Sequence, residues 1–293
     1  MKKILIAVSL IASQSALAIG IASGAANSGT NYPMVQDIVK QCSTTNTPIQ
    51  NIESNGALEN LHLIFGDKRV QYGIVDEVTL MYQQNVDPNM TSRIQTVFPF
   101  FSMELHLAVR KNSPFQSLTD LNQYKVYTGA EGSSTAVNAQ VLKGLTGVNW
   151  QDVNMPQSQA IAALKQNQVA AVFVVAGKGA TMFNDPEIRF IPIQHPKLDQ
   201  FKYYTRTMIP SGTYTGQNAP IQTYKVNNVL ATFAFKNQYQ KEIGDLVTCI
   251  AGNIDKLQAN GHPKWREVNP QNIDFVKWPV HPDRKSTRLN SSH

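Results

Sequence analysis

The chain has 293 residues, of which 42% are hydrophobic and 16% charged, with two cysteines and a formal net charge of +6. This composition supports one large or two medium folded domains and excludes a disulfide scaffold or a four-cysteine zinc site. Five basic residues, Lys2, Lys3, Arg284, Lys285 and Arg288, lie in terminal segments without acids, so the remainder is nearly neutral, which argues against nucleic-acid binding.

The N-terminal segment, residues 1–18, has the pattern of a secretory signal peptide. Lys2 and Lys3 form the charged region, Ile4–Ala12 is apolar, and Ala16-Leu17-Ala18 is a small-x-small cleavage site. A buried first helix is the alternative interpretation. No later run is long enough to span a bilayer, and no lipid-anchoring cysteine follows the signal. The sequence therefore predicts a periplasmic protein that begins near Ile19.

The first part of the mature chain alternates strands and helices. Predicted strands are Ile19–Ala22, Ile49–Glu53 and Tyr72–Val75. A helix containing Tyr32 to Cys42 follows the first strand, and a second helix from Leu58 ends near Gly66, with apolar residues at helical spacing in both. This alternation predicts a parallel α/β sheet.

The middle of the chain repeats the pattern, whereas the late part is predicted to be largely helical. The predicted elements are strands at Leu105–Arg110, Val126–Thr128 and Ala170–Val175, a helix at Thr135–Lys143, a turn-rich segment at Ile209–Tyr214 and a mainly helical region at Val226–Gln258. Residues 284–293 have no periodicity, and we interpret them as a non-native tail, with a natural disordered tail as the alternative.

Three loops share a design that suits the binding of an anion. Asn27–Tyr32, Ser54–Ala57 and Gly129–Thr135 each follow a strand, contain small polar residues and begin a helix. The first turn of a helix leaves backbone N–H groups free and carries partial positive charge. Several such ends at one edge of a sheet form a site for a carboxylate or phosphate. Each loop taken alone is better explained by helix capping, and three such loops in one chain are the stronger evidence.

Six segments in order make the chain resemble the substrate-binding subunit of TAXI-type TRAP transporters. They are Ser28–Pro33, Asn55–Leu61, Tyr72–Asp76, Gly129–Ala139, Phe173–Gly177 and Ile209–Gln217, and a closing Val280-His281-Pro282 is also similar. The best match is Gly129–Ala139, against Gly-Ala-Pro-Gly-Ser-Gly-Thr-Glu-x-Asn-Ala in the family. Ala136 replaces the usual glutamate, and the first loop has fewer glycines, which puts the ligand preference in doubt.

The resemblance implies an α/β protein of the type II periplasmic binding protein fold, with two α/β lobes joined by a hinge and a ligand cleft between them. Lobe 1 is expected at 19–108 and 214–283, and lobe 2 at 109–213, with crossings near Leu107–Arg110 and Pro210–Gly216. It implies a monomer that captures a small carboxylate or amino acid, such as glutamate, glutamine or 2-oxoglutarate, and delivers it to a TRAP membrane permease. No catalytic residue, cofactor or metal is expected.

Candidate ligand-binding residues follow from the loops and strand ends. They are Thr30, Tyr32, Asn55, Gly56, Asp76, Gly132, Ser133, Thr135, Asn138, Val175, Ala176, Gly177 and Tyr214. We expect hydroxyls and amides to donate to a carboxylate, Tyr32 to pack on an aliphatic part, Tyr214 to contact ligand or hinge, and Asp76 to receive an ammonium group. The alternatives are helix caps, core aromatic residues and a solvated loop acid.

The two cysteines, Cys42 and Cys249, are either a disulfide or two independent buried thiols. An oxidising periplasm permits a bond. The resemblance brings the C-terminal helices back to the first lobe, which would place Cys249 near the helix that bears Cys42.

Other functional classes are less well supported by the sequence. The histidines lack the i, i+4 spacing of a helical zinc site, and no Gly-x-Ser-x-Gly elbow, Walker motif or dinucleotide fingerprint is present. A secreted hydrolase is the remote alternative. A receptor for a sensor kinase or chemoreceptor, or an ABC-type binding protein, would share the fold, and a neighbouring permease gene would distinguish them.

Overall fold

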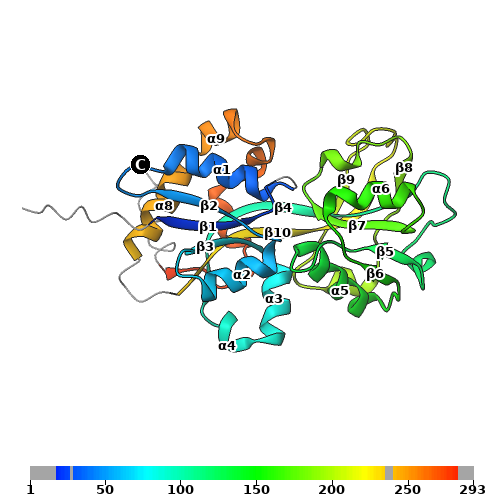
Figure 1. The fold of residues 1–293 in the computed structure, drawn as a ribbon, viewed down its shortest axis with the longest axis horizontal. Coiled ribbons are helices and arrows are strands. Elements are labelled where there is room, and N and C mark those ends of the chain that lie inside the picture. Colours follow the sequence, from blue (N-terminus) through cyan, green and yellow to red (C-terminus); the bar gives the residue numbers. More distant parts are fainter. Residues whose placement is uncertain (1–17, 27–28, 235–239, 283–293) are drawn as a thin grey trace, which may run out of the picture.

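The computed structural model of the protein describes residues 18–26, 29–234 and 240–282. These residues form one mixed sheet with the strand order β2-β1-β3-β10-β4-β7-β5-β6, in which β9 also pairs with β10 and β8 with β4. Figure 1 shows the helices and strands gathered into two halves that are joined by the long strands β4 and β10. The predicted α/β architecture is therefore confirmed.

The first half is built around three parallel strands. Its elements are β1 (Ile19–Gly24), α1 (Asn31–Cys42), β2 (Ile49–Glu53), α2 (Ala57–Gly66), β3 (Tyr72–Asp76), α3 (Glu77–Val86), α4 (Pro88–Thr91), α8 (Gln240–Gly252), α9 (Ile254–Asn260), and the 3₁₀ helices η5 (Pro263–Glu267) and η6 (Pro270–Phe275). The predicted strands and helices of this part agree with these bounds to within a few residues. Helix α3 was not predicted.

The second half has its own parallel strands, β5, β6 and β7, and lies on the right of Figure 1. Its elements are η1 (Thr119–Leu121), β5 (Lys125–Tyr127), α5 (Ser134–Thr146), β6 (Gln151–Val153), η2 (Gln157–Gln159), α6 (Ala160–Lys165), β7 (Ala171–Ala176), η3 (Thr181–Phe183), β8 (Ile188–Phe190), α7 (Pro196–Gln200) and β9 (Thr205–Ile209).

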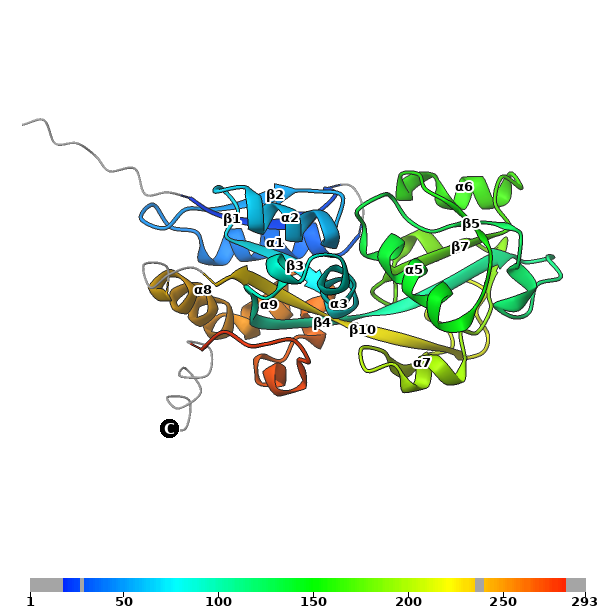
Figure 2. The same ribbon diagram turned by 90° about the horizontal axis from the view of Figure 1, so that it is seen from below.

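Strands β4 (Ile94–Arg110) and β10 (Ile221–Phe233) run side by side through both halves (Figure 2). β4 pairs with β10 up to Glu104, and from Glu104 onward it pairs with β7. β10 pairs with β9 up to Lys225 and with β3 from Asn228 onward. Both strands therefore change neighbours near Glu104, which marks the passage between the halves.

Two expectations about the late part of the chain are wrong. The prediction of a mainly helical Val226–Gln258 is wrong for its first part, which belongs to β10 as far as Phe233, whereas α8 and α9 are helical. Val226, Val229, Leu230 and Phe233 stand at the i, i+3, i+4, i+7 spacing of a helix, so this part of β10 matches the helical pattern although it lies in the sheet. The turn at Pro210–Gly216 joins β9 to β10 within the second half, so the crossing is β10 itself.

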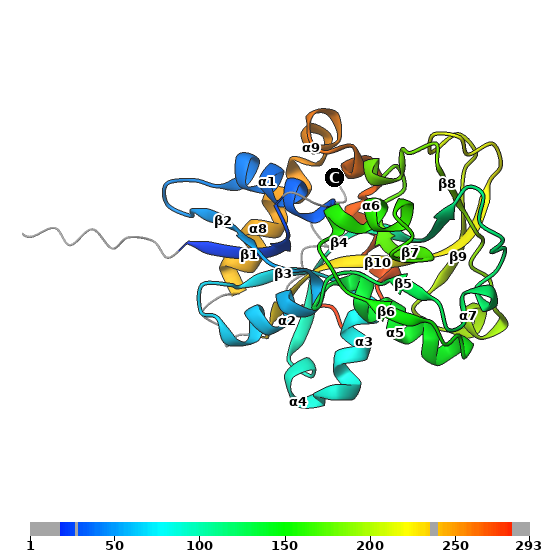
Figure 3. The same cartoon turned by 45° about the vertical axis from the view of Figure 1, so that its right-hand side comes forward.

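The helices α1 and α8 lie side by side on the first half (Figure 3). A disulfide joins Cys42 of α1 to Cys249 of α8, with 5.9 Å between their Cα atoms. The predicted pairing is confirmed. One apolar cluster also extends from Ile38 of α1 through Phe98 and Leu105 of β4 to Phe173 of β7, so the two halves share a core.

Among the described residues, no helix is both long enough and apolar enough to cross a membrane. The predicted signal peptide and the predicted tail lie outside the described residues, apart from Ala18.

Candidate functional site

Loops from the two halves touch at the carboxyl ends of their strands. The Leu58 amide, in the first turn of α2, donates a hydrogen bond to the Gly132 carbonyl at 3.1 Å. Gly56 has a φ of +131°, and a Cβ added there would stand 3.1 Å from the Ser133 Cα. Two of the three predicted loops therefore meet directly. We call the contact of residues 54–58 and Asp76 with residues 132–138 the loop interface.

Asp76 is the polar centre of the loop interface. Its fully buried carboxylate caps α3 by accepting from the Thr79 amide at 3.0 Å and the Thr79 hydroxyl at 2.6 Å. It also accepts from Ser134 Oγ at 2.6 Å and Asn138 Nδ2 at 3.1 Å, both in the second half. These donors occupy the carboxylate that was predicted to receive an ammonium group.

The side chains at the start of α5 make structural bonds as well. Ser133 caps the helix by accepting from the Ala136 amide, and the Thr135 hydroxyl accepts from the Val175 amide at 3.1 Å. Asn138 is buried, and its carbonyl oxygen accepts from the Tyr204 hydroxyl at 3.0 Å. Burial, together with the negative charge of Asp76, raises the pKa of Tyr204 well above its usual value, so this phenol stays protonated.

The other predicted residues lie around this interface or behind it. Thr30 and Tyr32 are half-buried at the start of α1, and Asn55 is exposed beside Gly132. Ala176 is the last residue of β7 and Gly177 follows it; both are buried, with the Lys264 side chain packed against Gly177. Asn27 and Ser28 of the first loop lie outside the described residues.

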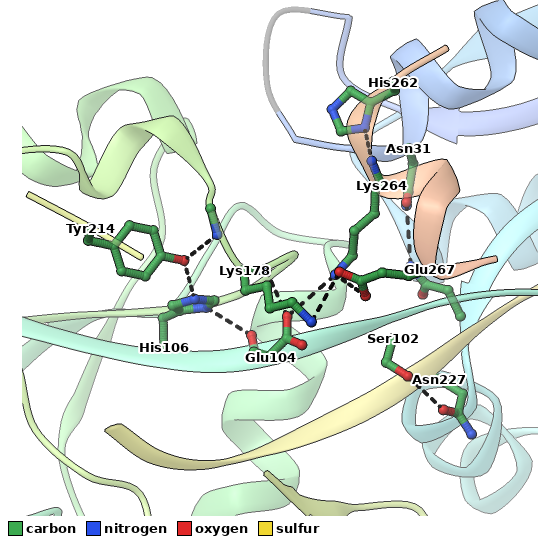
Figure 4. A network of polar contacts seen from close by, with 12 residues as sticks. Asn31, Ser102, Glu104, His106, Lys178, Tyr214, Asn227, His262, Lys264 and Glu267 are labelled. Atoms are coloured by element: carbon green, nitrogen blue, oxygen red, sulfur yellow. Dashed lines mark hydrogen bonds and ion pairs between the residues drawn. The ribbon is translucent and has the colours of Figure 1, made fainter. Parts of the chain in front are cut away.

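A charge cluster with a buried pair at its centre stands where β4 changes neighbours (Figure 4). The Glu104 side chain is 3% exposed and lies 3.6 Å from the ammonium of Lys264, which is 5% exposed. Glu104 also accepts from the Lys178 amide at 2.7 Å. Glu267 pairs with Lys264 at 2.7 Å and with Lys178 at 3.1 Å. The cluster thus connects the long strand to the end of β7 and to η5.

Tyr214 belongs to a buried hydrogen-bond chain that begins at the same place (Figure 4). His106 Nδ1 donates to the Glu104 carbonyl at 2.9 Å, so Nε2 accepts from the Tyr214 hydroxyl at 2.7 Å. Tyr214 in turn accepts from the Gly179 amide at 3.0 Å. Burial lowers the pKa of His106 to about 4, so its ring is neutral at pH 7. Tyr214 is therefore hydrogen-bonded, through His106, to β4 at the passage between the halves.

A polar pocket of about 450 Å³ lies along the long strands, and we call it the strand pocket. Its walls come from both halves, with Lys178, Thr205 and Lys225 on one side and Glu267 and Lys277 on the other. Glu104, Ser102 and Asn227 also line it, and Ser102 donates to Asn227 at 3.0 Å. None of the thirteen predicted ligand-binding residues lines this pocket.

The sequence contained only one signal for these charged residues. Glu104 and His106 interrupt the apolar run of β4, which marks buried polar groups in need of partners. Nothing in the sequence around Lys225, Lys264 or Lys277 distinguishes them from ordinary surface lysines. Within the described ranges, no three His, Cys, Asp or Glu side chains are grouped so as to hold a metal ion.

Comparisons with known proteins agree with this architecture. A model of the NMT1-like family matches residues 21–282. A solved protein described as a periplasmic transporter superposes with a TM-score of 0.55 at 15% identity, covering 83% of this chain and 84% of that one. The amino acid ABC transporter substrate-binding protein AbpA of Streptococcus pneumoniae, bound to L-arginine, gives 0.52 at 15% identity, with 89% and 95% covered.

A third similar structure is the putative periplasmic sulfonate-binding protein SsuA of Methylobacillus flagellatus KT. Its TM-score is 0.50 at 15% identity, with 94% of this chain and 77% of that chain covered. At such identities the similarity establishes the fold, which is the type II periplasmic binding protein fold expected above.

Proposed function

The chain belongs to the NMT1-like family, and on this premise we propose that it is an extracytoplasmic solute-binding protein rather than an enzyme. It captures a small carboxylate or amino acid between its two halves and delivers it to a membrane transporter. The observation that carries this function is the loop interface, where strand ends of two halves that are joined by long strands meet through polar groups. The signal-like residues 1–18 support a periplasmic location.

The proposed cycle begins with separation of the loops. When the Gly132 carbonyl leaves the Leu58 amide, the first turn of α2 regains a free N–H group that suits a carboxylate. The matching start of α5, with Ser133 and Thr135, approaches from the other half. A ligand that contacts both ends favours the closed form by its difference in affinity for the closed and open forms.

The two halves serve as the lobes of this cycle. From the resemblance to TAXI-type subunits we expect lobe 1 at 19–108 and 214–283 and lobe 2 at 109–213. The strand pairing supports a pivot slightly earlier in β4, at Glu104, and slightly later in β10, between Lys225 and Asn228.

Two kinds of transporter fit the proposal. The six sequence segments that resemble TAXI-type subunits support a TRAP permease driven by an ion gradient. Two of the three solved structures named above, AbpA and SsuA, are described as ABC transporter proteins, which supports an ATP-driven partner as the second candidate. Uptake by membrane vesicles that contain the cognate permease separates them, because only an ABC partner requires ATP.

Ligand binding is tested by thermal unfolding of the purified protein with a panel of amino acids and small carboxylates. A ligand at 100 times its Kd adds about 2.7 kcal/mol to the free energy of unfolding, which raises the melting temperature. The S133A/T135A variant should fold and bind at least tenfold weaker. The matched control is S117A/T119A, which removes an exposed pair of the same residue types and spacing. Equal affinity in the folded S133A/T135A variant would overturn the assignment of these residues.

A further inference from the structure

The strand pocket has a charge distribution that the loop interface lacks. Glu104 and Glu267, its two acids, are both engaged with Lys264 and Lys178. Lys225 stands directly opposite Glu104 in the β4–β10 register, yet its ammonium lies within ion-pair distance of no acid in the described ranges. Lys225 therefore adds a positive charge to the pocket that no described acid neutralises.

Lys277 supplies a second positive charge from the other half, and this charge acts electrostatically on Glu77 without forming an ion pair with it. Its ammonium donates to the Lys202 carbonyl, a neutral group, and forms no ion pair with an acid among residues 18–26, 29–234 and 240–282. The Lys277 amide is held by the Glu77 carboxylate, which fixes the backbone at the pocket wall. Two lysines from different halves thus line one pocket, and neither ammonium forms an ion pair with an acid in the described part of the chain.

The rest of the lining suits a small organic anion. Ser102, Thr205 and Asn227 offer hydroxyl and amide groups, whereas Phe100 and Val276 offer apolar surface. The volume of about 450 Å³ lies within the range of ordinary ligand pockets, roughly 300–1,000 Å³. Two separated cationic groups with an apolar patch in the same pocket match two carboxylates joined by a short aliphatic chain.

We propose that the strand pocket is a binding site for a small dicarboxylate, with Lys225 holding one carboxylate and Lys277 the other. This site is distinct from the loop interface and does not depend on it. Because the two lysines belong to different halves, a bound dicarboxylate stabilises the arrangement in which the halves are packed together. The pocket is thus a second ligand site that acts on the same hinge.

The test is calorimetric titration of the full chain with succinate, with acetate and putrescine as the monoanion and dication probes. Succinate should bind the wild type saturably and more tightly than acetate, putrescine should not bind, and added salt should weaken the binding. Lys225→Met and Lys277→Met should each weaken it at least tenfold. Lys125→Met, which removes an exposed strand lysine outside the pocket, is the matched control and should leave it unchanged.

Two results would overturn the proposal. One is the absence of saturable binding of succinate and glutarate to the wild type at millimolar concentrations. The other is equal affinity in wild type and in Lys225→Met or, where that variant is unfolded by circular dichroism, in Lys225→Gln. A dicarboxylate that loses affinity in S133A/T135A but not in Lys225→Met binds at the loop interface, which refutes the pocket site and leaves the proposed function standing.

Discussion

The loop interface and the strand pocket lie between the same two halves, but their polar groups are satisfied differently. At the loop interface the Asp76 carboxylate is satisfied by other protein groups, since it accepts hydrogen bonds from Thr79, Ser134 and Asn138. In the strand pocket, the ammonium of Lys225 has no acid partner among the described residues. Residues of the sequence motifs can therefore bond to one another where the two halves meet, while lysines without an ion-pair partner line a different pocket.

The largest expected effect tests whether the charge cluster beside the strand pocket holds the halves together. Lys264→Met leaves the buried Glu104 carboxylate without its ammonium partner, and such a loss typically costs about 3–5 kcal/mol. We expect urea unfolding to show a decrease of this size, with Lys125→Met within about 0.5 kcal/mol of wild type. A decrease below about 1 kcal/mol would show that Glu104 is solvated when Lys264 is absent.

The next largest effect is a pH dependence of the free energy of unfolding. It comes from His106, on β4 near the passage between the halves, and not from the loop interface. Burial holds the pKa of His106 at about 4, below its ordinary value near 6.5. The unfolded chain therefore takes up a proton first as the pH falls, so the contribution of His106 to stability is complete above pH 6.5 and is lost towards pH 4. The loss amounts to about 3 kcal/mol.

This pH dependence is measured as the difference between wild type and His106→Gln. Burial raises the pKa of Glu77, which has the opposite effect on stability, but this contribution is the same in both proteins and cancels. Parallel stability curves for the two proteins between pH 7 and pH 4 would contradict a buried neutral His106.

A smaller effect is expected at the loop interface, where no buried charge pair is broken. Asp76→Asn removes the carboxylate that accepts from both α3 and α5, and a hydrogen bond to a charged group contributes about 1.5–3 kcal/mol. We expect a loss of about 2 kcal/mol, in keeping with this range. Asn138→Ala removes one of these donors and also the acceptor of the buried Tyr204 hydroxyl, so it should cost about as much. An Asp76→Asn protein as stable as wild type would mean that the interface opens freely in solution.

The smallest effect concerns the contact of the two loops. Gly56→Ala forces a Cβ to within 3.1 Å of the Ser133 Cα from a backbone with φ of +131°, which should cost about 1 kcal/mol and loosen the interface. The matched control is Gly144→Ala in α5, where the added Cβ meets open space and should stabilise the helix by about 1 kcal/mol. Thermal unfolding that shifts both variants in the same direction would contradict the proposed contact.

Local sequence patterns predicted the first half well and the late part poorly. α1 and β2 agree with their expected bounds because helix-start residues and apolar spacing are properties of neighbouring residues. The pattern predicts a helix at the end of β10 because Val226, Val229, Leu230 and Phe233 have helical spacing, whereas pairing with β3 and β4 makes this segment a strand. Sequence patterns also failed to predict that the chain passes between the halves in β10, because this depends on which strands pair with one another.

For the candidate site, the sequence identified the loop interface but not the strand pocket. The match at residues 129–139 indicated the start of α5, and Ser54–Ala57 indicated its partner, because small residues at helix starts are visible in a single segment. Which groups those loops would bond to was not visible. Thr135 engages the Val175 amide, and Asp76 accepts from Ser134, through strands and helices that only the fold brings together.

By itself, the sequence determined the α/β class, the alternation of strands and helices in the first half and the three polar loops, since these depend on periodicity and turn chemistry within short segments. The tertiary structure alone decided the closure of the loops, the pairing of Glu104 with Lys264 and the placing of Lys225 and Lys277 around one pocket. Each of these joins residues far apart in the chain. Their proximity is set by strand register and by the change of neighbours at Glu104, which no short segment encodes.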